Sequence, residues 1–292
     1  MFKVILFIIK MICIFSLEKK EKKVFCEELK YTSCITVKGK TDGFGAQYNA
    51  IMSGIAYSSY CNIEYCHTPI KKTGDHIISL SGVNKIIGYD KGYNCSSRCA
   101  KHIHFHSQVE KIGVNIVYNE TMRLQVLRKH FNQGSNEIPS ACQYSNSSII
   151  SIKNIAIHVR RGDVKSTGRN QNRYIPLNNF LNFLNKYDSN EKIKASKNSK
   201  NIKLMYHIFT EKNTLSISEK NAISNFKKNK TLIMHDSLSA LTTFKCFVYA
   251  EVLILSKSAF SLAAAYLTEG DVFYTKFTHV EKTPLSHWQE WK

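Results

Sequence analysis

Beyond residue 150 the sequence alternates regularly between short apolar runs and longer segments with helical periodicity. The apolar runs have the length and composition of strands that are buried on both faces of a parallel sheet. The expected strands are 154–159, 203–209, 231–235, 251–255 and 272–275, and the expected helices are 177–187, 216–226, 237–248 and 259–267. This alternation predicts an α/β fold, with a doubly wound parallel sheet in the carboxyl-terminal half.

The amino-terminal half has fewer regular elements. A strand is expected at residues 33–37, a glycine-bearing loop at 38–47 and a helix at 46–60. A strand, a glycine loop and a helix in this order can hold phosphates at the helix amino terminus. No Walker lysine follows Gly45, however, and the dinucleotide fingerprint is incomplete. A further helix is expected at residues 120–131.

The polar segment 133–151, which contains Pro139, is the best candidate for a domain boundary. It divides the chain into domains of residues 26–150 and 151–292, each long enough to bury a core. The segment 188–201 is rich in Lys, Asn and Ser, and it is expected to be a surface loop without a function of its own.

Residues 1–25 have the character of a signal peptide or a signal anchor. An apolar run from Val4 to Leu17 is interrupted by Lys10 and followed by charged residues. A membrane-spanning helix needs about 20 apolar residues, so the run suits the core of a signal peptide better. No clean cleavage site follows, which leaves an uncleaved membrane anchor open. A buried first strand or helix is the structural alternative.

Cysteine usage points to the secretory pathway. Eight cysteines follow the apolar run, namely Cys26, Cys34, Cys61, Cys66, Cys95, Cys99, Cys142 and Cys246. An even number fits disulfides, although the pairing does not follow from the sequence. Seven of the eight precede residue 143, which predicts at least two disulfides among residues 26–142 and a buried Cys246 thiol that folding does not require. Four sequons agree with this compartment, at Asn94, Asn119, Asn146 and Asn229.

The formal net charge of +19 raises the question of a nucleic-acid partner. The lysines, however, are spread along the chain among Asn and Ile, without a basic block or a helical stripe. A lysine-rich background explains the charge better, so no nucleic acid is expected as a partner.

Metal binding is a further class that the residue spacing disfavours. His102, His104 and His106 would share one face of a strand. Successive same-face residues are about 7 Å apart, too far for neighbouring ligands unless the strand bends, so an exposed strand face is expected. The cysteine spacings 61–66 and 95–99 do not match the usual zinc knuckle, and disulfides are favoured there.

The segment 154–163 changes abruptly from an apolar strand to a charged turn. Side chains alternate along a strand, so His158 and Arg160 are expected to converge on one side, just past its carboxyl end. Ligands of open α/β sheets bind there. Arg161 is expected to point elsewhere and to pair with Asp163, while Gly162 lets the backbone turn.

Arginine is scarce in this chain, and its placement is uneven. Of the 41 Lys and Arg residues only seven are Arg, and four of these fall within fourteen residues, at positions 160, 161, 169 and 173. A chain that otherwise chooses lysine keeps arginine where a planar, bidentate donor is needed, and phosphate is the usual target. A surface ion pair at a strand end is the alternative.

The sequence His-Val-Arg-Arg-Gly-Asp at residues 158–163 resembles the His-x-Arg-Arg-x-Asp motif of the fucosyltransferase superfamily, most closely that of α-1,2-fucosyltransferases (glycosyltransferase family 11-like). Residues 42–47 are similar to the Gly-x-Gly-Asn-Gln loop of that family, and residues 256–267 to its Ser-Ser-Phe-Ser-Trp-Trp segment. Ala46 stands where the family has Asn, and Leu262 and Ala263 replace the Trp pair.

The resemblance implies an inverting, metal-independent transfer of fucose from GDP-fucose to a glycan acceptor, with α-1,2 as the expected linkage. It also implies two Rossmann-like halves that face a cleft (GT-B-like). The amino-terminal domain would bind the acceptor and the carboxyl-terminal domain the nucleotide sugar, without a cofactor. The implied donor-binding residues are His158, Arg160, Arg161, Gly43, Gly45, Asp236, Ser258, Phe260 and Ser261. For Asp236, which would hold the guanine edge, a helix cap is the alternative.

Arg160 is expected to neutralise the diphosphate as the glycosidic bond breaks. An inverting transfer also needs a general base. Asp163 is the acid nearest to Arg160, but an ion pair that fixes the loop suits it better, and Asp42 would reach the cleft from the opposite half. A transferase for another sugar nucleotide is an alternative. So is an inactive glycan-binding protein of the Golgi or ER lumen, which Ala46 and the missing Trp pair favour.

Overall fold

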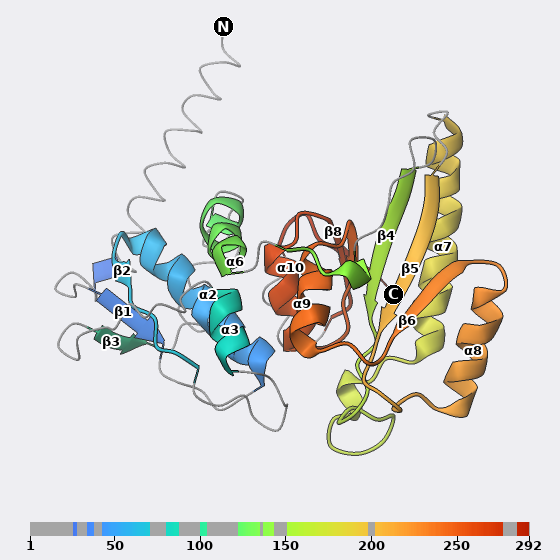
Figure 1. Cartoon of the computed structure of the whole chain (residues 1–292), viewed down its shortest axis with the longest axis horizontal. Helices are drawn as coiled ribbons and strands as arrows, with labels where there is room; N and C mark the ends of the chain where they lie inside the picture. Colours follow the sequence, from blue (N-terminus) through green and yellow to red (C-terminus); the bar gives the residue numbers. More distant parts are fainter. Residues whose placement is uncertain are drawn as a thin grey trace, which may run out of the picture.

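The protein is an α/β molecule with two parallel sheets (Figure 1). The computed structural model describes residues 26–27, 34–37, 43–70, 80–87, 100–103, 122–134, 137–142, 151–197, 202–276 and 285–291. Residues 1–25, the expected leader, lie outside them. Among the described residues no helix combines the length and the apolarity that crossing a membrane requires.

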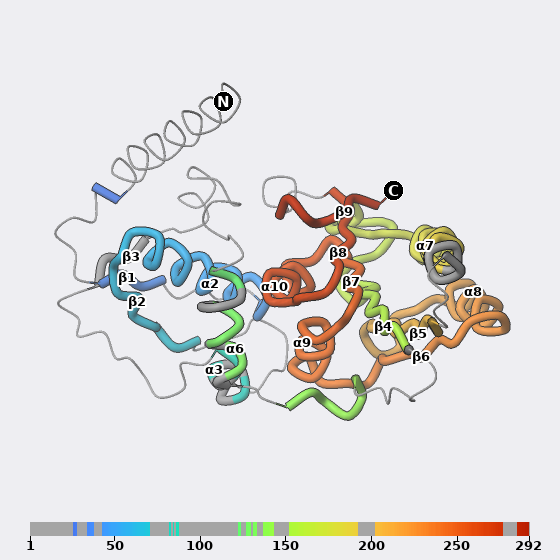
Figure 2. The backbone as a smooth tube through the Cα atoms, turned by 90° about the horizontal axis from the view of Figure 1, so that it is seen from above, coloured from blue at the N-terminus to red at the C-terminus, as the bar shows by residue number. Residues whose placement is uncertain are grey.

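The carboxyl-terminal half is built on a six-stranded sheet in the order β6-β5-β4-β7-β8-β9, in which every neighbouring pair is parallel. Its strands are β4 (Ser151–His158), β5 (Ile202–Phe209), β6 (Thr231–His235), β7 (Val252–Ile254), β8 (Asp271–Tyr274) and β9 (Gln289–Glu290). One face carries α7 (Leu177–Lys197) and α8 (Ile217–Lys227), and the other carries α9 (Ala240–Val248) and α10 (Ala259–Leu267) (Figures 1 and 2). A parallel sheet with helices on both faces is the architecture that the alternation predicts.

The central strand β4 shows why these segments form strands. Ile155, Ile157 and Val159 pack into the apolar cluster under α7 and α8, while Ala156 faces the cluster under α9 and α10. Both sets are buried. A strand that is covered on both faces reads as a continuous apolar run, as this one does.

The amino-terminal half holds a smaller parallel sheet in the order β2-β1-β3. Its elements are β1 (Cys34–Val37), α2 (Phe44–Cys61), β2 (Glu64–Tyr65), α3 (Leu80–Ile87) and β3 (Ala100–Ile103), followed by a π-helical turn η2 (Met122–Leu127), α6 (Arg128–Gly134) and a 3₁₀ turn η3 (Ser140–Cys142). The expected helix at 120–131 is therefore π-helical in its first part. Of the expected histidine-bearing strand, β3 is described, while His104 and His106 lie outside the described residues.

The two halves share an apolar core. Helix α2 packs against α10, and Ile51 and Ile55 of α2 belong to the same buried cluster as Leu262 and Tyr266 of α10. Helices α9 and α10 accordingly lie between the two sheets (Figures 1 and 2).

Two buried arginines of the amino-terminal half close helix ends in the carboxyl-terminal half. Nη1 of Arg123 donates to the carbonyl oxygen of Thr268, at 3.0 Å, just past the end of α10. Nη1 of Arg128 donates to the carbonyl oxygen of Val248 at 3.2 Å, at the end of α9, and its guanidinium lies 4.9 Å from the Tyr249 ring. The last carbonyls of a helix have no partner within it, so these contacts satisfy groups that burial would otherwise penalise.

The expected loop at 188–201 is wrong for most of its length, because α7 continues to Lys197. Two of the polar residues that suggested a loop pair with residues in or next to strands of the sheet. Asp188 is buried, accepts a hydrogen bond from Tyr206 Oη at 3.1 Å and pairs with Lys230. Glu191 is also buried and pairs with Lys153 at 3.0 Å. Buried charges persist where partners compensate for lost hydration.

Several element boundaries also differ from the expected ones. Strand β4 begins at Ser151, three residues early, and α9 begins at Ala240, three residues late, because Ser239 caps it by accepting a hydrogen bond from the Thr242 amide. The short elements β2, α3 and β9 were not predicted. Strand β9 leads to Trp291, whose ring lies 5.0 Å from that of Phe180.

The disulfides correct the cysteine prediction in part. Cys26 pairs with Cys61, within the expected range, but Cys142 pairs with Cys246. The prediction of Cys246 as a lone thiol is therefore wrong, because α9 packs beside the segment that carries Cys142. Cys34 and Cys66 are buried, and Cys95 and Cys99 lie outside the described residues.

Candidate functional site

The candidate site lies at the carboxyl end of β4, where it meets the loop between its neighbour β7 and α10. His158 Nδ1 lies 2.8 Å from Ser256 Oγ, and Arg160 Nη1 donates to Ser258 Oγ at 3.0 Å. The two side chains therefore reach the same loop from the same side of the strand. Strand alternation predicts this convergence.

Arg160 also forms an ion pair with Asp163. Nη2 of Arg160 lies 2.9 Å from both carboxylate oxygens, and Nε lies 3.3 Å from Oδ1. Between them Gly162 has a φ of +66°, a left-handed conformation that turns the chain back. Asn170 donates a further hydrogen bond to Asp163 Oδ2 at 3.2 Å. Asp163 is thus paired with Arg160, and the expected pair with Arg161 is wrong.

Arg161 points to the opposite face of the sheet, where protein groups hold it. Its Nη2 lies 2.6 Å from Glu219 Oε1 and donates to the carbonyl oxygen of Ile175 at 3.1 Å. Its guanidinium stacks 4.4 Å from the centre of the Tyr174 ring. Only 3% of Arg161 is exposed. These contacts hold its guanidinium on the face opposite to Arg160, and its role in donor binding stays a prediction.

Glu219 explains why Arg161 takes this direction. It is the third residue of α8, and its side chain accepts a hydrogen bond from the amide of Ser216, while Ser216 Oγ caps the amide of Glu219. Burial alone would raise the pKa of Glu219, but these hydrogen bonds and the charge of Arg161 hold it below its usual value. The capping box therefore fixes the carboxylate of Glu219 on the α8 side of the strand. Strand alternation directs Arg161 to the same side, where the two side chains pair.

His158 is a neutral imidazole at neutral pH. Burial, and secondarily the charges of Arg160 and Arg161, lower its pKa to about 3. The rings of Phe247 and Phe260 lie 5.3 and 5.8 Å from it. Nδ1 of a neutral ring can donate a hydrogen bond to Ser256 Oγ or accept one from it, depending on the tautomer. Either way, His158 holds the β7–α10 loop in place.

The amino terminus of α10 contributes Ser258, Phe260 and Ser261. Ser258 is the N-cap, and its Oγ accepts from the amide of Phe260 at 3.3 Å as well as from Arg160. Ser261 is fully buried, and its Oγ donates to the carbonyl oxygen of Ser258 at 3.4 Å. Ser258 and Ser261 thus shape the helix start, and Phe260 is the only one of the three that is partly exposed.

The amino-terminal glycine loop meets the same helix start. A Cβ on Gly45 would lie 2.4 Å from Cα of Phe260, so only glycine permits this approach. Asn49 Nδ2 donates to the carbonyl oxygen of Ala259 at 2.9 Å. Gly43 is the N-cap residue of α2, and its carbonyl oxygen accepts from the amides of Ala46 and Gln47. The structure therefore brings the three motif segments together. Asp42, expected in the same place, lies outside the described residues.

Asp236 stands apart from this cluster. It is exposed and follows β6, which is separated from β4 by β5. Two strand spacings amount to about 10 Å. The alternative interpretation as a helix cap is wrong, because Ser239 caps α9.

Sequence reasoning did not assign a role to Arg173, Ser256 or Lys257, although all three belong to this site. Nε of Arg173 donates to the carbonyl oxygen of Lys257 at 3.2 Å. The sequence places Arg173 in the cluster of arginines and Ser256 and Lys257 in the motif segment 256–267. Their individual contacts could not be predicted, because the partners come from other segments of the chain.

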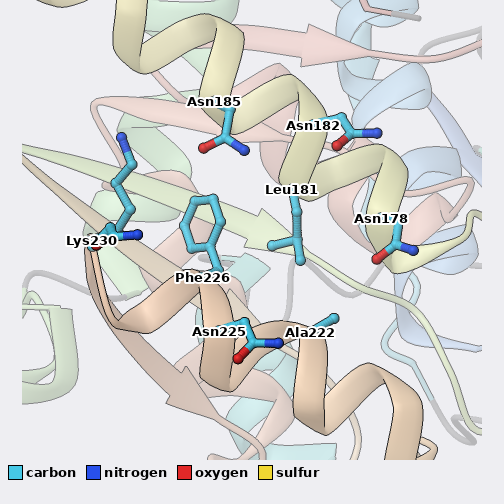
Figure 3. A pocket seen from close by; sticks show the side chains of 9 residues that line it. Asn178, Leu181, Asn182, Asn185, Ala222, Asn225, Phe226 and Lys230 are labelled. Atoms are coloured by element: carbon cyan, nitrogen blue, oxygen red, sulfur yellow. The ribbon is translucent and has the colours of Figure 1, made fainter.

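A pocket of about 330 Å³ lies away from the arginines, between α7 and α8 (Figure 3). Its lining is Asn178, Leu181, Asn182, Asn185, Ala222, Asn225, Phe226, Asn229 and Lys230. The chemistry of this pocket is amide-rich and lacks an acid. Within the described ranges no three His, Cys, Asp or Glu side chains group into a potential metal site.

No protein-family model matches the chain, and no curated protein is significantly similar to it. The resemblance to fucosyltransferases therefore rests on the three motif segments, which the structure brings together at the start of α10.

Proposed function

We propose that this protein is an inverting, metal-independent glycosyltransferase that moves fucose from GDP-fucose to a glycan hydroxyl, with an α-1,2 linkage as the specific expectation. The observation that carries the proposal is the convergence of Arg160 with Ser258 at the start of α10, beside the glycine loop of α2. Ligands of parallel sheets bind at this edge, and a helix amino terminus favours an anion.

Arg160 would stabilise the leaving group. When the bond between the sugar C1 and the β-phosphate oxygen breaks, negative charge grows on the diphosphate, and a fixed guanidinium stabilises that charge. Ser258 already holds Nη1 of Arg160. The other two nitrogens of Arg160, Nε and Nη2, bond to Asp163 in the structure. A phosphate that binds them must therefore displace the carboxylate of Asp163.

The acceptor hydroxyl attacks C1 from the opposite side, and a base takes its proton. Asp163 suits this role poorly, because its carboxylate oxygens are already occupied by Arg160 and Asn170 in the structure. We therefore assign the base to Asp42. Asp42→Asn should lower turnover at saturating donor with little change in GDP affinity, whereas Asp163→Asn should lower stability and GDP affinity together. A fully active Asp42→Asn protein and a folded, GDP-bound but inactive Asp163→Asn protein would reverse the two assignments.

The arrangement that fits this proposal is GT-B-like, with the acceptor on the side of residues 26–150 and the donor on the side of residues 151–292. Support comes from the two parallel sheets and from the contact of α2 with α10. His158, Phe260 and Gly43 would position the donor through the loop and helix ends that they shape, and Asp236 would hold the guanine.

We place the protein in the lumen of the Golgi or ER, anchored or secreted through residues 1–25. The disulfides Cys26–Cys61 and Cys142–Cys246 support this placement. Asn229 is exposed and belongs to a sequon, so Asn229→Gln should remove one N-glycan from protein made in a secretory host, whereas Asn225→Gln should remove none. An unchanged glycan count in Asn229→Gln would mean that this sequon stays unmodified.

A second candidate is a glycan-binding protein of the same fold without turnover. The closed pair between Arg160 and Asp163 favours it. The loss of the Trp pair does not, because Leu262 and Ala263 are buried in the core, where their change affects packing rather than acceptor contact. A transferase that uses another sugar nucleotide is the remaining enzyme candidate.

One experiment separates these candidates. Purified protein is heated with GDP, UDP, CMP or ADP, and a ligand that binds the native state raises the melting temperature. Stabilisation by GDP alone supports the fucosyltransferase, and stabilisation by another nucleotide supports a different donor. Release of fucose from GDP-fucose, to water or to an acceptor, then distinguishes the enzyme from the inactive protein.

A further inference from the structure

Arg173 and the β7–α10 loop hold each other in place. Nε of Arg173 donates to the carbonyl oxygen of Lys257 at 3.2 Å, and Nζ of Lys257 donates to the carbonyl oxygen of Asn172 at 3.0 Å. Arg160 contacts Ser258, the next residue of the loop, at 3.0 Å. Two guanidinium groups from different segments therefore contact successive residues at the start of α10.

The two arginines also interact electrostatically. Burial lowers the pKa of Arg173, the charge of Arg160 lowers it further, and the carboxylate of Asp163 acts in the opposite direction. Asp163 pairs directly with Arg160, and its charge also acts on Arg173. Two like charges that act on each other in a partly buried site cost free energy, and a bound anion lowers that cost.

Arg173 has donors left for such an anion. Among the described residues, neither terminal nitrogen of Arg173 has a hydrogen-bond partner, and its side chain is only partly exposed. Since Nε is fixed on Lys257, the orientation of the guanidinium is set before any ligand arrives. A planar guanidinium that is held in this way matches phosphate oxygens.

We propose that Arg173 contacts the diphosphate of the nucleotide as the partner of Arg160, and that Asp163 holds the place of one phosphate when the site is empty. This inference rests on the proposed nucleotide-sugar function. A diphosphate offers two phosphoryl groups to two guanidinium groups, and each would gain charge-assisted hydrogen bonds.

The test compares Arg173→Gln with wild type and with Arg169→Gln, by calorimetric titration with GDP, guanosine and inorganic pyrophosphate. Arg169 lies in the same loop and is exposed, so its substitution controls for loss of a positive charge. We expect Arg173→Gln to bind GDP and pyrophosphate about tenfold or more weakly, with unchanged guanosine affinity. Arg169→Gln should bind all three ligands as wild type does.

Equal GDP affinity in wild type and Arg173→Gln would overturn the inference. Parallel losses of GDP and guanosine affinity would also overturn it, because they would mean that Arg173 only supports the loop. A wild type that binds pyrophosphate but not GDP would refute the proposed donor and leave Arg173 testable with pyrophosphate. Arg173→Lys, which keeps the charge and loses the planar fork, should recover part of the pyrophosphate affinity if the contact is direct.

Discussion

Arg160 and Arg161 are consecutive residues whose guanidinium groups form ion pairs on opposite faces of the same sheet. Arg160 pairs with Asp163 on the side of α10, where part of its surroundings is open to solvent. Arg161 pairs with Glu219 of α8 and is almost completely buried. Arg160 therefore lies in the candidate site, whereas Arg161 contributes to the stability of the fold.

Substitution of each arginine should distinguish these roles. Arg160→Lys keeps a charge but loses the bidentate geometry. If the proposed function holds, it should lower the turnover of GDP-fucose by about 10²–10³ while the protein stays folded. Arg161→Met leaves the buried carboxylate of Glu219 without its partner, and it should lower the free energy of unfolding by about 3 kcal/mol. Normal turnover in Arg160→Lys would remove Arg160 from the mechanism.

Acid should destabilise the protein well above the range in which carboxylates titrate. Burial holds the pKa of His158 at about 3 in the folded state, whereas an unfolded histidine has a pKa of about 6.5. The unfolded state therefore binds the proton first, and stability is lost as the pH falls below about 6.5. At pH 5 this one group should cost about 2 kcal/mol. His207, with a pKa of about 3, and His67, with about 4, act in the same direction.

Urea unfolding at pH 7, 6 and 5 measures this effect. His158→Gln should flatten the pH dependence by the share of one histidine. If wild type and His158→Gln lost stability in parallel, the folded His158 would take up its proton normally.

The disulfide between Cys142 and Cys246 should contribute to stability. It closes a loop with a sequence separation of 104 residues, which restricts the unfolded chain, and its loss should cost about 3 kcal/mol. Cys142→Ala and Cys246→Ala should therefore lower the melting temperature to a similar extent, and the double variant should add little. Additive losses would indicate that each residue contributes only by its packing.

Gly45→Ala should weaken the contact between α2 and α10. The new methyl group would meet the backbone of Phe260, which cannot rotate away as a side chain can. We expect a loss of about 2 kcal/mol in the free energy of unfolding. Ala46→Ser, at the adjacent and partly exposed position, is the control and should be nearly neutral. Unchanged stability in Gly45→Ala would mean that the two helices separate at little cost.

Much of the carboxyl-terminal half could be predicted because its central strands are buried on both faces and its helices alternate with them. Strand β6 and helix α10 have the predicted bounds, and the convergence of His158 with Arg160 follows from alternation alone. These features depend on local sequence, so the sequence is sufficient to find them.

The features that could not be predicted depend on partners far away in the sequence. Asp188 was predicted to begin a loop, but it lies within α7 and is buried. Its contacts with Lys230 and Tyr206 compensate for the burial of its charge. Glu219 decides the direction of Arg161, and it lies 58 residues further along the chain. Cys246 resembled a core thiol until the fold brought Cys142 beside it.

Arg123 and Arg128 have a consequence for how the two halves of this chain could be recombined with those of other proteins. Both come from the amino-terminal half, and both satisfy carbonyl groups at the ends of α9 and α10 in the other half. A chimera that joined residues 151–292 to a different amino-terminal half would inherit helix ends without donors, unless the new half carried arginines at the corresponding positions. Changes to this chain are therefore more accessible through point substitutions in its loops than through exchange of whole halves.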